Sequence, residues 1–479
     1  MDTIVAISTP YGTGGIAVIR LSGADAFSIA DRAWIGCRLA DATSHTAHLG
    51  TITSGDDRSP LDQAVATVFK ASNSFTGENT VEFSVHGSKW IQMQVVNRLV
   101  SLGARPAEPG EFTRRAFLNG RMDLAQAEGV ADLIAASSRA AHRLAMSQIS
   151  GGFSTRINEL RERLIDLASL LELELDFSEE DVEFADRAKL RSITDETITL
   201  IERLASTYAA GKAFKEGVPV AIAGRPNAGK STLLNALLGE DKAIVSDIPG
   251  TTRDVIDDTK EIAGVLFRFY DTAGLRYTDD VVERIGIDRA HDAIERAAAV
   301  IWMIDASLGE EDMISQLEYV KEQLNAYLQP KHLIVFNKCD LAADSVIENL
   351  ICGTRVKSLA DNTLCDAASG NDEVRVEVLR ISARTGKNID MLESTLVDMA
   401  KSEHDPESEL IVTNARHHAE LQSGLESLRR VREGLETGLS ADFIAQDVRE
   451  ALHHLGTVTG AVTTDTLLTT IFTRFCIGK

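Results

Sequence analysis

The stretch Gly224–Ser231, which reads GRPNAGKS, constrains the fold of this chain more than any other part of its sequence. It fits the pattern G-x-x-x-x-G-K-[ST], in which glycines let successive backbone N–H groups turn toward phosphate oxygens. The apolar run 218–223 predicts a buried strand before the loop, and residues 231–238 predict a helix that Gly239 ends. Because such a helix directs its positive end at the loop, the sequence predicts a nucleoside triphosphate site.

Further polar motifs follow strand-like runs downstream of this loop. They are TTRD at 251–254, DTAG at 271–274, Asp305, NKCD at 337–340 and SAR at 382–384. Ligand residues at the carboxyl ends of strands are typical of a doubly wound α/β sheet. One such motif alone would be a polar turn, but their succession predicts a complete nucleotide site.

Each motif has a chemical role at such a site. Lys230 should reach the β- and γ-phosphates, while the Ser231 and Thr252 hydroxyls ligate Mg²⁺. Asp271 can hold the Mg²⁺ shell, and the Gly274 amide can sense the γ-phosphate. The predicted GTP-binding residues are Asn227, Ala228, Gly229, Lys230, Ser231, Thr232, Ser246, Asp247, Ile248, Pro249, Gly250, Thr251, Thr252, Asp271, Thr272, Ala273, Gly274, Asn337, Lys338, Asp340, Ser382, Ala383 and Arg384.

The NKCD motif predicts that the base is guanine. The Asp340 carboxylate can accept hydrogen bonds from guanine N1–H and from its exocyclic amine, a donor pair that adenine does not present. Asn337 and Lys338 would support the base, and the Ala383 amide can contact the exocyclic oxygen. We therefore expect GTP rather than ATP.

Composition bounds the remaining possibilities. The chain has 479 residues and a net charge of −23, which argues against broad, sequence-independent nucleic-acid binding. No apolar run is long enough to span a membrane, and the N-terminus has no basic region followed by an apolar one. The five cysteines form no C-x-x-C pair, so we expect reduced thiols, no zinc site and a cytoplasmic location.

The segments around the nucleotide motifs have different patterns. Residues 1–118 alternate strand-like and helical runs, with Arg20 and Glu82 in or beside apolar strands, where charges need partners. An ordinary ion pair at a strand edge explains these two residues equally well. From about residue 120 to 215 apolar residues recur at helical spacing, including 124–134, 157–173 and 190–208.

The GRPNAGKS, TTRD, DTAGLR, NKCD and SAR motifs resemble those of Ras-type GTPases of the Era/TrmE class. The segment PGEFTRRAFLNGRMDLAQAE at 109–128 and the terminal FCIGK at 475–479 resemble the MnmE (TrmE) family of tRNA-modification GTPases. This resemblance runs from residue 3 to the last residue. It implies a multidomain α/β protein: an α+β folate-binding and dimerisation domain at 1–118, an all-α helical domain at 119–215 and 401–479, and an inserted Ras-like GTPase domain at 216–400.

The resemblance also implies cofactors and partners. A homodimer would act with the FAD-dependent protein MnmG (GidA) in a hetero-oligomer. Together they would add an aminomethyl or carboxymethylaminomethyl group to carbon 5 of the wobble uridine of tRNA, with 5-formyltetrahydrofolate or another reduced folate as one-carbon donor. The family's folate contacts correspond to Arg20, Glu82, Arg121 and Lys479, although arginine replaces the family's common lysine at position 121.

The family's hydrolytic positions carry over in the same way. K⁺ ligands correspond to Asn227, Ser246, Ile248 and Thr251, and Glu283 corresponds to the glutamate that orients the attacking water through a second water. Leu275 follows the DTAG motif and cannot orient water as the Ras glutamine does, so a bound K⁺ would supply the positive charge. Lys230 and Glu283 are thus the predicted catalytic residues of hydrolysis. Cys476 is a candidate nucleophile near the folate, or an inert small side chain.

Two other functions stay open at this point. A ribosome-assembly GTPase would use hydrolysis only to time its release, but such proteins usually carry a basic RNA-binding module that this chain lacks. A folate-dependent enzyme could instead carry a merely regulatory GTPase. The long polar span between Asp340 and Ser382 is predicted to be an inserted surface loop.

Overall fold

The computed structural model describes residues 2–176, 187–239, 258–271, 291–327, 330–342, 347, 357–358, 376–401, 410–473, 475 and 478; the side chains of 172–176, 271 and 357–358 are not part of that description. The chain divides into two compact units. The first comprises residues 1–135, 145–201 and 419–479, and the second comprises 136–144 and 202–418.

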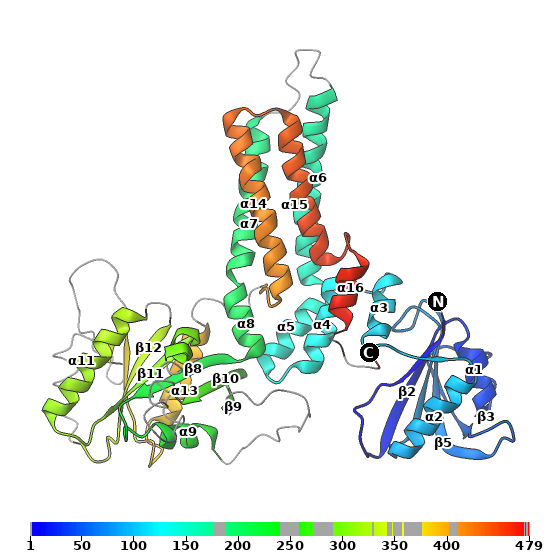
Figure 1. Cartoon of the computed structure of the whole chain (residues 1–479), viewed down its shortest axis with the longest axis horizontal. Coiled ribbons are helices and arrows are strands. Elements are labelled where there is room, and N and C mark those ends of the chain that lie inside the picture. Colours follow the sequence, from blue (N-terminus) through cyan, green and yellow to red (C-terminus); the bar gives the residue numbers. More distant parts are fainter. Residues whose placement is uncertain are drawn as a thin grey trace, which may run out of the picture. The chain divides into compact units, whose positions relative to one another are not determined.

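A mostly antiparallel sheet of seven strands opens the first unit (Figure 1). Its strands are β1 (Ile4–Ile7), β2 (Ile16–Ser22), β3 (Trp34–Ile35), β4 (Thr46–Thr53), β5 (Pro60–Phe69), β6 (Thr80–His86) and β7 (Arg105–Pro106), in the order β3-β4-β5-β6-β2-β1-β7. Only β7 pairs in parallel, with β1. Because side chains alternate along a strand, Val5 packs into the core on one face, and Ile4 and Ala6 into the core on the other.

Helices cover both faces of this sheet. Helices α1 (Ala26–Ala33) and α2 (Lys89–Ser101) pack on the Val5 face through buried residues such as Ile29 and Val95. Helix α3 (Glu111–Leu118) packs on the opposite face, where Phe112 is fully buried against Ile4 and Ala6. The alternation of strands and helices predicted for residues 1–118 is present.

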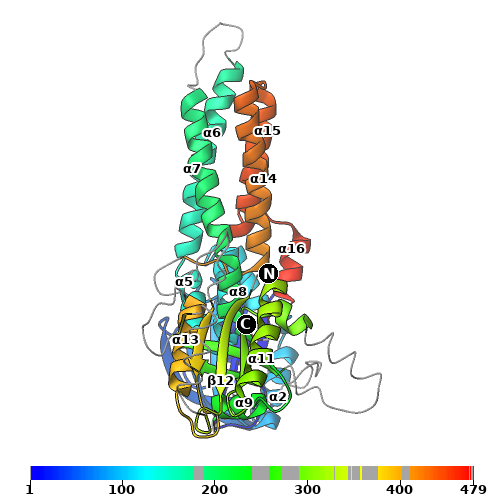
Figure 2. The ribbon, with the colours of Figure 1, turned by 90° about the vertical axis from the view of Figure 1, so that its left-hand side faces the viewer.

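The rest of the first unit is helical. Helices α6 (Gly152–Asp176), α7 (Arg187–Ser206), α14 (Ala415–Thr437) and α15 (Ala441–Thr459) run side by side, although α14 and α15 lie more than 200 residues beyond α7 (Figures 1 and 2). Leucines at helical spacing, such as Leu160, Leu164 and Leu167 of α6, are fully buried. The chain therefore builds its bundle from two distant segments.

Four shorter helices are also present in the described part of the chain. They are α4 (Leu124–Ala135), α5 (Arg139–Ile149), α8 (Tyr208–Glu216) and α16 (Asp465–Phe472). Leu468 and Phe472 of α16 share a core with Leu124 of α4, and Phe117 of α3 packs against it. The helix predicted over 190–208 is interrupted at Thr207, where α8 begins anew. Among the described residues, no helix combines the length and the apolar character that a membrane span requires.

The second unit is built on a second sheet of seven strands, in the order β13-β14-β12-β11-β8-β10-β9. The strands are β8 (Val218–Gly224), β9 (Asp258–Ile262), β10 (Val265–Asp271), β11 (Ala299–Asp305), β12 (Lys331–Asn337), β13 (Lys357–Ser358) and β14 (Glu377–Arg380). Every pair is parallel except β9 with β10.

Helices lie on both faces of this sheet too. Helices α9 (Lys230–Leu238) and α13 (Ile389–Lys401) share one core with Val220 and Ile222, while α11 (Glu310–Ala326) shares the other with Ala221 and Trp302. Figure 2 shows β12 between α13 and α11. This is a doubly wound sheet, so the predicted fold class is confirmed. The predicted four-part division at residues 118, 215 and 400 stays a prediction.

Candidate functional site

The phosphate loop lies between the end of β8 at Gly224 and the start of α9 at Lys230. Gly229 has φ +96°, and an added Cβ there would lie 2.3 Å from Asn337 Nδ2, so only glycine fits. Asn227 also adopts a left-handed backbone, with φ +67°, and its side chain is exposed. The left-handed backbone at Asn227 and Gly229 thus lets the loop turn tightly into the N-terminus of α9, the end at which helices bind phosphate.

Lys230 is the buried cation of this loop. The residue is only 6% exposed, and its Nζ donates hydrogen bonds to the carbonyl oxygens of Gly224 at 2.6 Å and Arg225 at 2.9 Å. Its ammonium group therefore lies directly over the loop backbone. Ser231 and Thr232 follow in the first turn of α9, where both are exposed.

Asn337, at the end of β12, joins the phosphate loop to the predicted base loop. Asn337 is 2% exposed. Its Nδ2 donates to the carbonyl oxygen of Ala228 at 2.8 Å, and its Oδ1 accepts from the amide of Ala383 at 2.9 Å. These two loops are far apart in the sequence. One buried amide side chain therefore fixes the distance between the part predicted to bind phosphates and the part predicted to bind guanine.

Lys338 is held by a carboxylate that sequence reasoning did not pair with it. Its Nζ donates to Asp305 Oδ2 at 2.5 Å, at the end of the neighbouring strand β11. Burial alone would raise the pKa of Asp305, but the hydrogen bonds from Lys338 and Ser307 outweigh it and lower that pKa. Asp340 and Arg384 are exposed at the same edge of the sheet, while Ser382 is buried.

Several predicted residues lie outside the described part of the chain. They are Ser246, Asp247, Ile248, Pro249, Gly250, Thr251, Thr252, Thr272, Ala273, Gly274, Glu283, Cys476 and Lys479. The backbone of Asp271 is described, and it pairs with Ile222 of β8 just before the phosphate loop. The parallel sheet thus places the backbone of Asp271, the first residue of the DTAG motif, beside the strand that leads into the phosphate loop.

Two of the predicted folate residues lie on the N-terminal sheet. Arg20 of β2 and Glu82 of β6 are directly opposite in the strand register, and Arg20 Nε donates to Glu82 Oε1 at 2.8 Å. Their side chains remain 18% and 25% exposed. The exposed Arg121 follows α3, and Ser8 Oγ donates to the carbonyl oxygen of Gly478 at 3.2 Å, next to the predicted Lys479.

Two aromatic residues beside Arg20 were missed from the sequence. The Arg20 guanidinium carbon lies 5.2 Å from the centre of the Phe75 ring and 5.5 Å from that of Phe112. Such stacking stabilises and orients a guanidinium group. No periodicity in the sequence marks Phe75, because it lies in a connection between strands. Within the described residues, no group of three or more His, Cys, Asp or Glu could hold a metal ion.

Comparison with known proteins covers the whole chain. The family model for the MnmE helical domain matches residues 124–476, and the model for the GTP-binding protein TrmE N-terminus matches residues 3–121. A protein of Christiangramia forsetii named tRNA modification GTPase MnmE is 46% identical over 100% of this chain and 99% of its own length. A protein of the same name from Bacteroides fragilis is also 46% identical, over 100% and 99%.

Among solved structures, a point variant of Aquifex aeolicus Era bound to GDP·AlF4⁻ is 28% identical over 43% of this chain and 65% of that chain, with a TM-score of 0.28. That score is too low to carry an argument. The family models and the full-length relatives are decisive by themselves. The chain belongs to the MnmE (TrmE) family of tRNA modification GTPases.

Proposed function

We propose that this protein hydrolyses GTP in the course of tRNA modification. The observation that carries the proposal is the pairing of a complete phosphate loop with an NKCD segment through Asn337, in a chain whose full-length relatives are named tRNA modification GTPases. Lys230 and the α9 N-terminus supply positive charge to the phosphates, and Asp340 lies exposed where a guanine base would meet it.

Metal ions fit this donor set. The Ser231 hydroxyl, in the first turn of α9, would ligate Mg²⁺ together with Thr252. The exposed Asn227 side chain would ligate K⁺ together with Ser246, Ile248 and Thr251. When bound, these ions supply positive charge for the developing negative charge on the phosphates. Since Leu275 has no polar group, we assign the positioning of water to Glu283.

The finer chemistry follows from the family and is part of the proposal. A reduced folate would bind at Arg20, Glu82, Arg121 and Lys479 and provide the one-carbon unit. The FAD of MnmG would provide the redox chemistry, and the product would be a substituted carbon 5 on the wobble uridine of tRNA, in the cytoplasm. The Arg20–Glu82 pair fits a pterin-like ring because it offers a cation and an acceptor side by side, both part-exposed.

The dependence of hydrolysis on the monovalent cation tests the GTPase part. We expect much faster turnover in K⁺ than in Na⁺, since the smaller ion fits the Asn227 site less well. Asn227→Gly should remove this difference, because glycine keeps the left-handed backbone of φ +67° and deletes only the side chain. Equal rates of the unmutated protein in both salts would refute the K⁺ assignment.

Calorimetry with 5-formyltetrahydrofolate tests the folate part. We expect the unmutated protein to bind it and Glu82→Ala to bind it more weakly. The substitution removes the carboxylate acceptor and leaves Arg20 without its partner at 2.8 Å. Circular dichroism should verify that the variant is folded. No binding heat with folded, unmutated protein would refute the folate site and leave the GTPase proposal intact.

A further inference from the structure

The orientation of Arg20 depends on groups outside its own strand. Phe75, in the connection between β5 and β6, and Phe112, on α3, both face its guanidinium, at 5.2 and 5.5 Å. Phe75 is partly buried in the same small core as Phe112. If the connection moved, one of the two rings that hold Arg20 would move with it.

The same connection touches a second predicted folate residue. An added Cβ on Gly77 would lie 3.2 Å from Cγ of Arg121, so the stem of Arg121 lies directly on the connection. Asn119 Nδ2 also donates to the carbonyl oxygen of Thr76 at 2.7 Å. The segment Ser74–Glu78 therefore contacts both arginines. Phe75 meets the guanidinium of Arg20, and Gly77 meets the aliphatic stem of Arg121.

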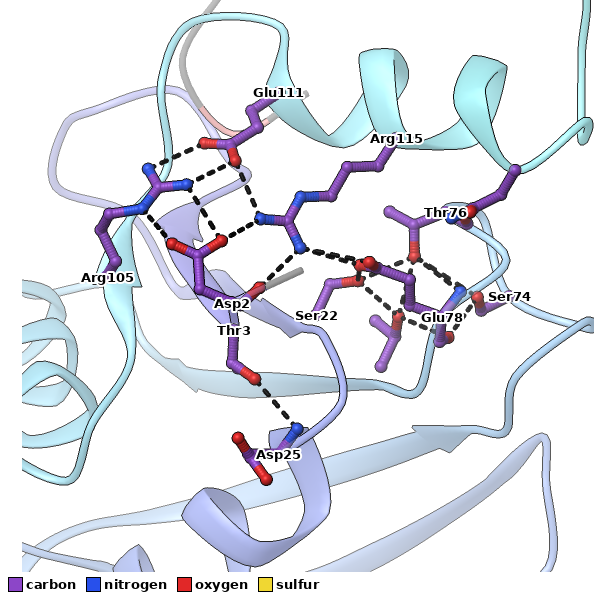
Figure 3. Close-up of polar contacts among 12 residues, drawn as sticks. Asp2, Thr3, Ser22, Asp25, Ser74, Thr76, Glu78, Arg105, Glu111 and Arg115 are labelled. Carbon is purple, nitrogen blue, oxygen red and sulfur yellow. Dashed lines mark hydrogen bonds and ion pairs between the residues drawn. The ribbon is translucent and has the colours of Figure 1, made fainter.

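A network of polar side chains fixes this segment (Figure 3). Ser22 of β2 is within 2.7 Å of Thr76 Oγ1 and donates to Glu78 Oε2 at 3.0 Å. Ser74 Oγ donates to the carbonyl oxygen of Glu78 at 2.5 Å. The segment is thereby bonded at residues on both sides of Phe75.

Arg115 of α3 is the centre of the network. Its side chain is 4% exposed, and its Nη1 donates to both carboxylate oxygens of Glu78 at 3.2 Å. Its Nη2 donates to Asp2 Oδ1 and to Glu111 Oε1, each at 2.9 Å. Arg105 shares both of these carboxylates, at 2.7 Å from Asp2 and 2.6 Å from Glu111 (Figure 3). Arg115 thus ties the segment to α3 and to the start of β1.

Asp2 and Glu111 stay ionised in this arrangement. Hydrogen bonding to Arg105 lowers the pKa of Asp2 to about 2. Burial of Glu111 would raise its pKa, but hydrogen bonds from Arg105, from the Glu108 amide and from Arg115 outweigh it and lower that pKa. The bonds from Arg115 to Asp2 and Glu111 are therefore intact throughout the neutral pH range.

We propose that Arg115 and Glu78 are positioning residues for the reduced-folate site, and that they act by holding Phe75 against the guanidinium of Arg20. This inference rests on the proposed function, because it takes Arg20 as a folate contact. Neither Arg115 nor Glu78 needs to touch the ligand. Their effect on binding passes through Phe75 and Arg20.

Two variants perturb this link in different ways. Glu78→Gln weakens the contact with Arg115 but leaves Arg115 its bonds to Asp2 and Glu111. Phe75→Leu keeps an apolar side chain in the small core but removes the ring, so it tests the link even if Glu78→Gln fails to fold. Each should raise the Kd for 5-formyltetrahydrofolate about tenfold in calorimetry, with unchanged GTP turnover.

Matched controls come from the same domain. Asp56→Asn removes the carboxylate partner of Arg98, an arginine–carboxylate pair at 2.9 Å that does not involve the segment Ser74–Glu78. Phe27→Leu replaces a partly buried phenyl ring that packs against the core on the Val5 face of the sheet, opposite to Phe75. Both controls should leave the Kd within about twofold of the unmutated value.

A double-mutant cycle separates positioning from a general loss of structure. Arg20→Lys keeps the charge but lacks the planar group that the rings stack on. In this background, Glu78→Gln and Phe75→Leu should each change the Kd less than about twofold, because the group they position is gone. An undiminished tenfold effect in the Arg20→Lys background would overturn the inference while leaving the folate site standing. No binding by the unmutated protein would remove both.

Discussion

Replacing Asn337 with alanine should uncouple the two halves of the nucleotide site. The side chain makes two hydrogen bonds, to the carbonyl oxygen of Ala228 at 2.8 Å and from the amide of Ala383 at 2.9 Å. Ala228 and Ala383 are only 1% and 6% exposed, so both backbone groups lose a partner where water reaches poorly. An unsatisfied buried polar group costs about 1–3 kcal/mol, and the pair therefore about 2–6 kcal/mol.

Only part of this cost affects binding, because part of it destabilises the free protein and the nucleotide complex equally. We assign about 2–3 kcal/mol to the loss of mutual order between the loops, which corresponds to about 30- to 150-fold weaker GTP and GDP binding. Titration with fluorescent guanine nucleotides measures this directly.

Asn388→Gly is a matched control for this variant. It removes a hydrogen bond of the same kind, from Nδ2 to the carbonyl oxygen of Arg380 at 2.7 Å, and glycine accepts the positive φ of 59°. We expect less than about threefold weaker binding in the control. If Asn337→Ala bound nucleotide as tightly as the control, the coupling of the loops through this side chain would be wrong.

Three further predictions concern other residues. Asp340→Asn should bind and hydrolyse XTP better than GTP in a competition assay, because the new amide can donate to the carbonyl at carbon 2 of xanthine; continued preference for GTP would exclude Asp340 as the base reader. Burial lowers the pKa of His332 to about 4, and its neutral ring accepts from Trp302 Nε1 at 3.1 Å and bonds the Tyr327 carbonyl oxygen at 2.7 Å. The unfolded chain binds that proton more readily than the folded one. The free energy of unfolding in urea should therefore be highest above pH ~6.5 and lower by roughly 3 kcal/mol toward pH 4. His332→Gln should abolish this loss. Cys476→Ser should retain GTP turnover but lose tRNA modification; retained modification would make this cysteine structural.

Much of the nucleotide unit could be predicted because its signals are local. Apolar runs of strand length end at Gly224, Asp271 and Asn337, and each strand ends at or within one residue of the prediction. Each motif carries its own chemistry at a fixed spacing. The parallel sheet then brings the strand ends together without further information in the sequence.

The surroundings of Arg20 could not be predicted in this way. Its pairing with Glu82 depends on the register of β2 with β6, and its stacking depends on a connection and a helix from elsewhere in the chain. A Glu111–Arg115 pair at helical spacing was readable in principle. Its bonds to Asp2 and Glu78 arise only from tertiary packing, for which no local pattern exists.

The buried partners of the base loop were equally hidden. That Asn337 supports guanine stays a prediction, and the motif alone does not reveal that its side chain joins Ala228 to Ala383. Lys338 pairs with Asp305, which the sequence marks only as a strand end. A motif predicts which groups gather at a site, but only the structure shows which partner each side chain binds.

We propose that GTP hydrolysis by this protein serves the modification of tRNA. The most direct test is nucleoside analysis of tRNA from cells that carry the gene, lack it, or carry a Lys230→Ala copy shown to be folded and deficient in hydrolysis. We expect a modified wobble uridine only with the unmutated gene. Full modification in cells lacking the gene would contradict the claim, and full modification with Lys230→Ala would show that hydrolysis is not required for it.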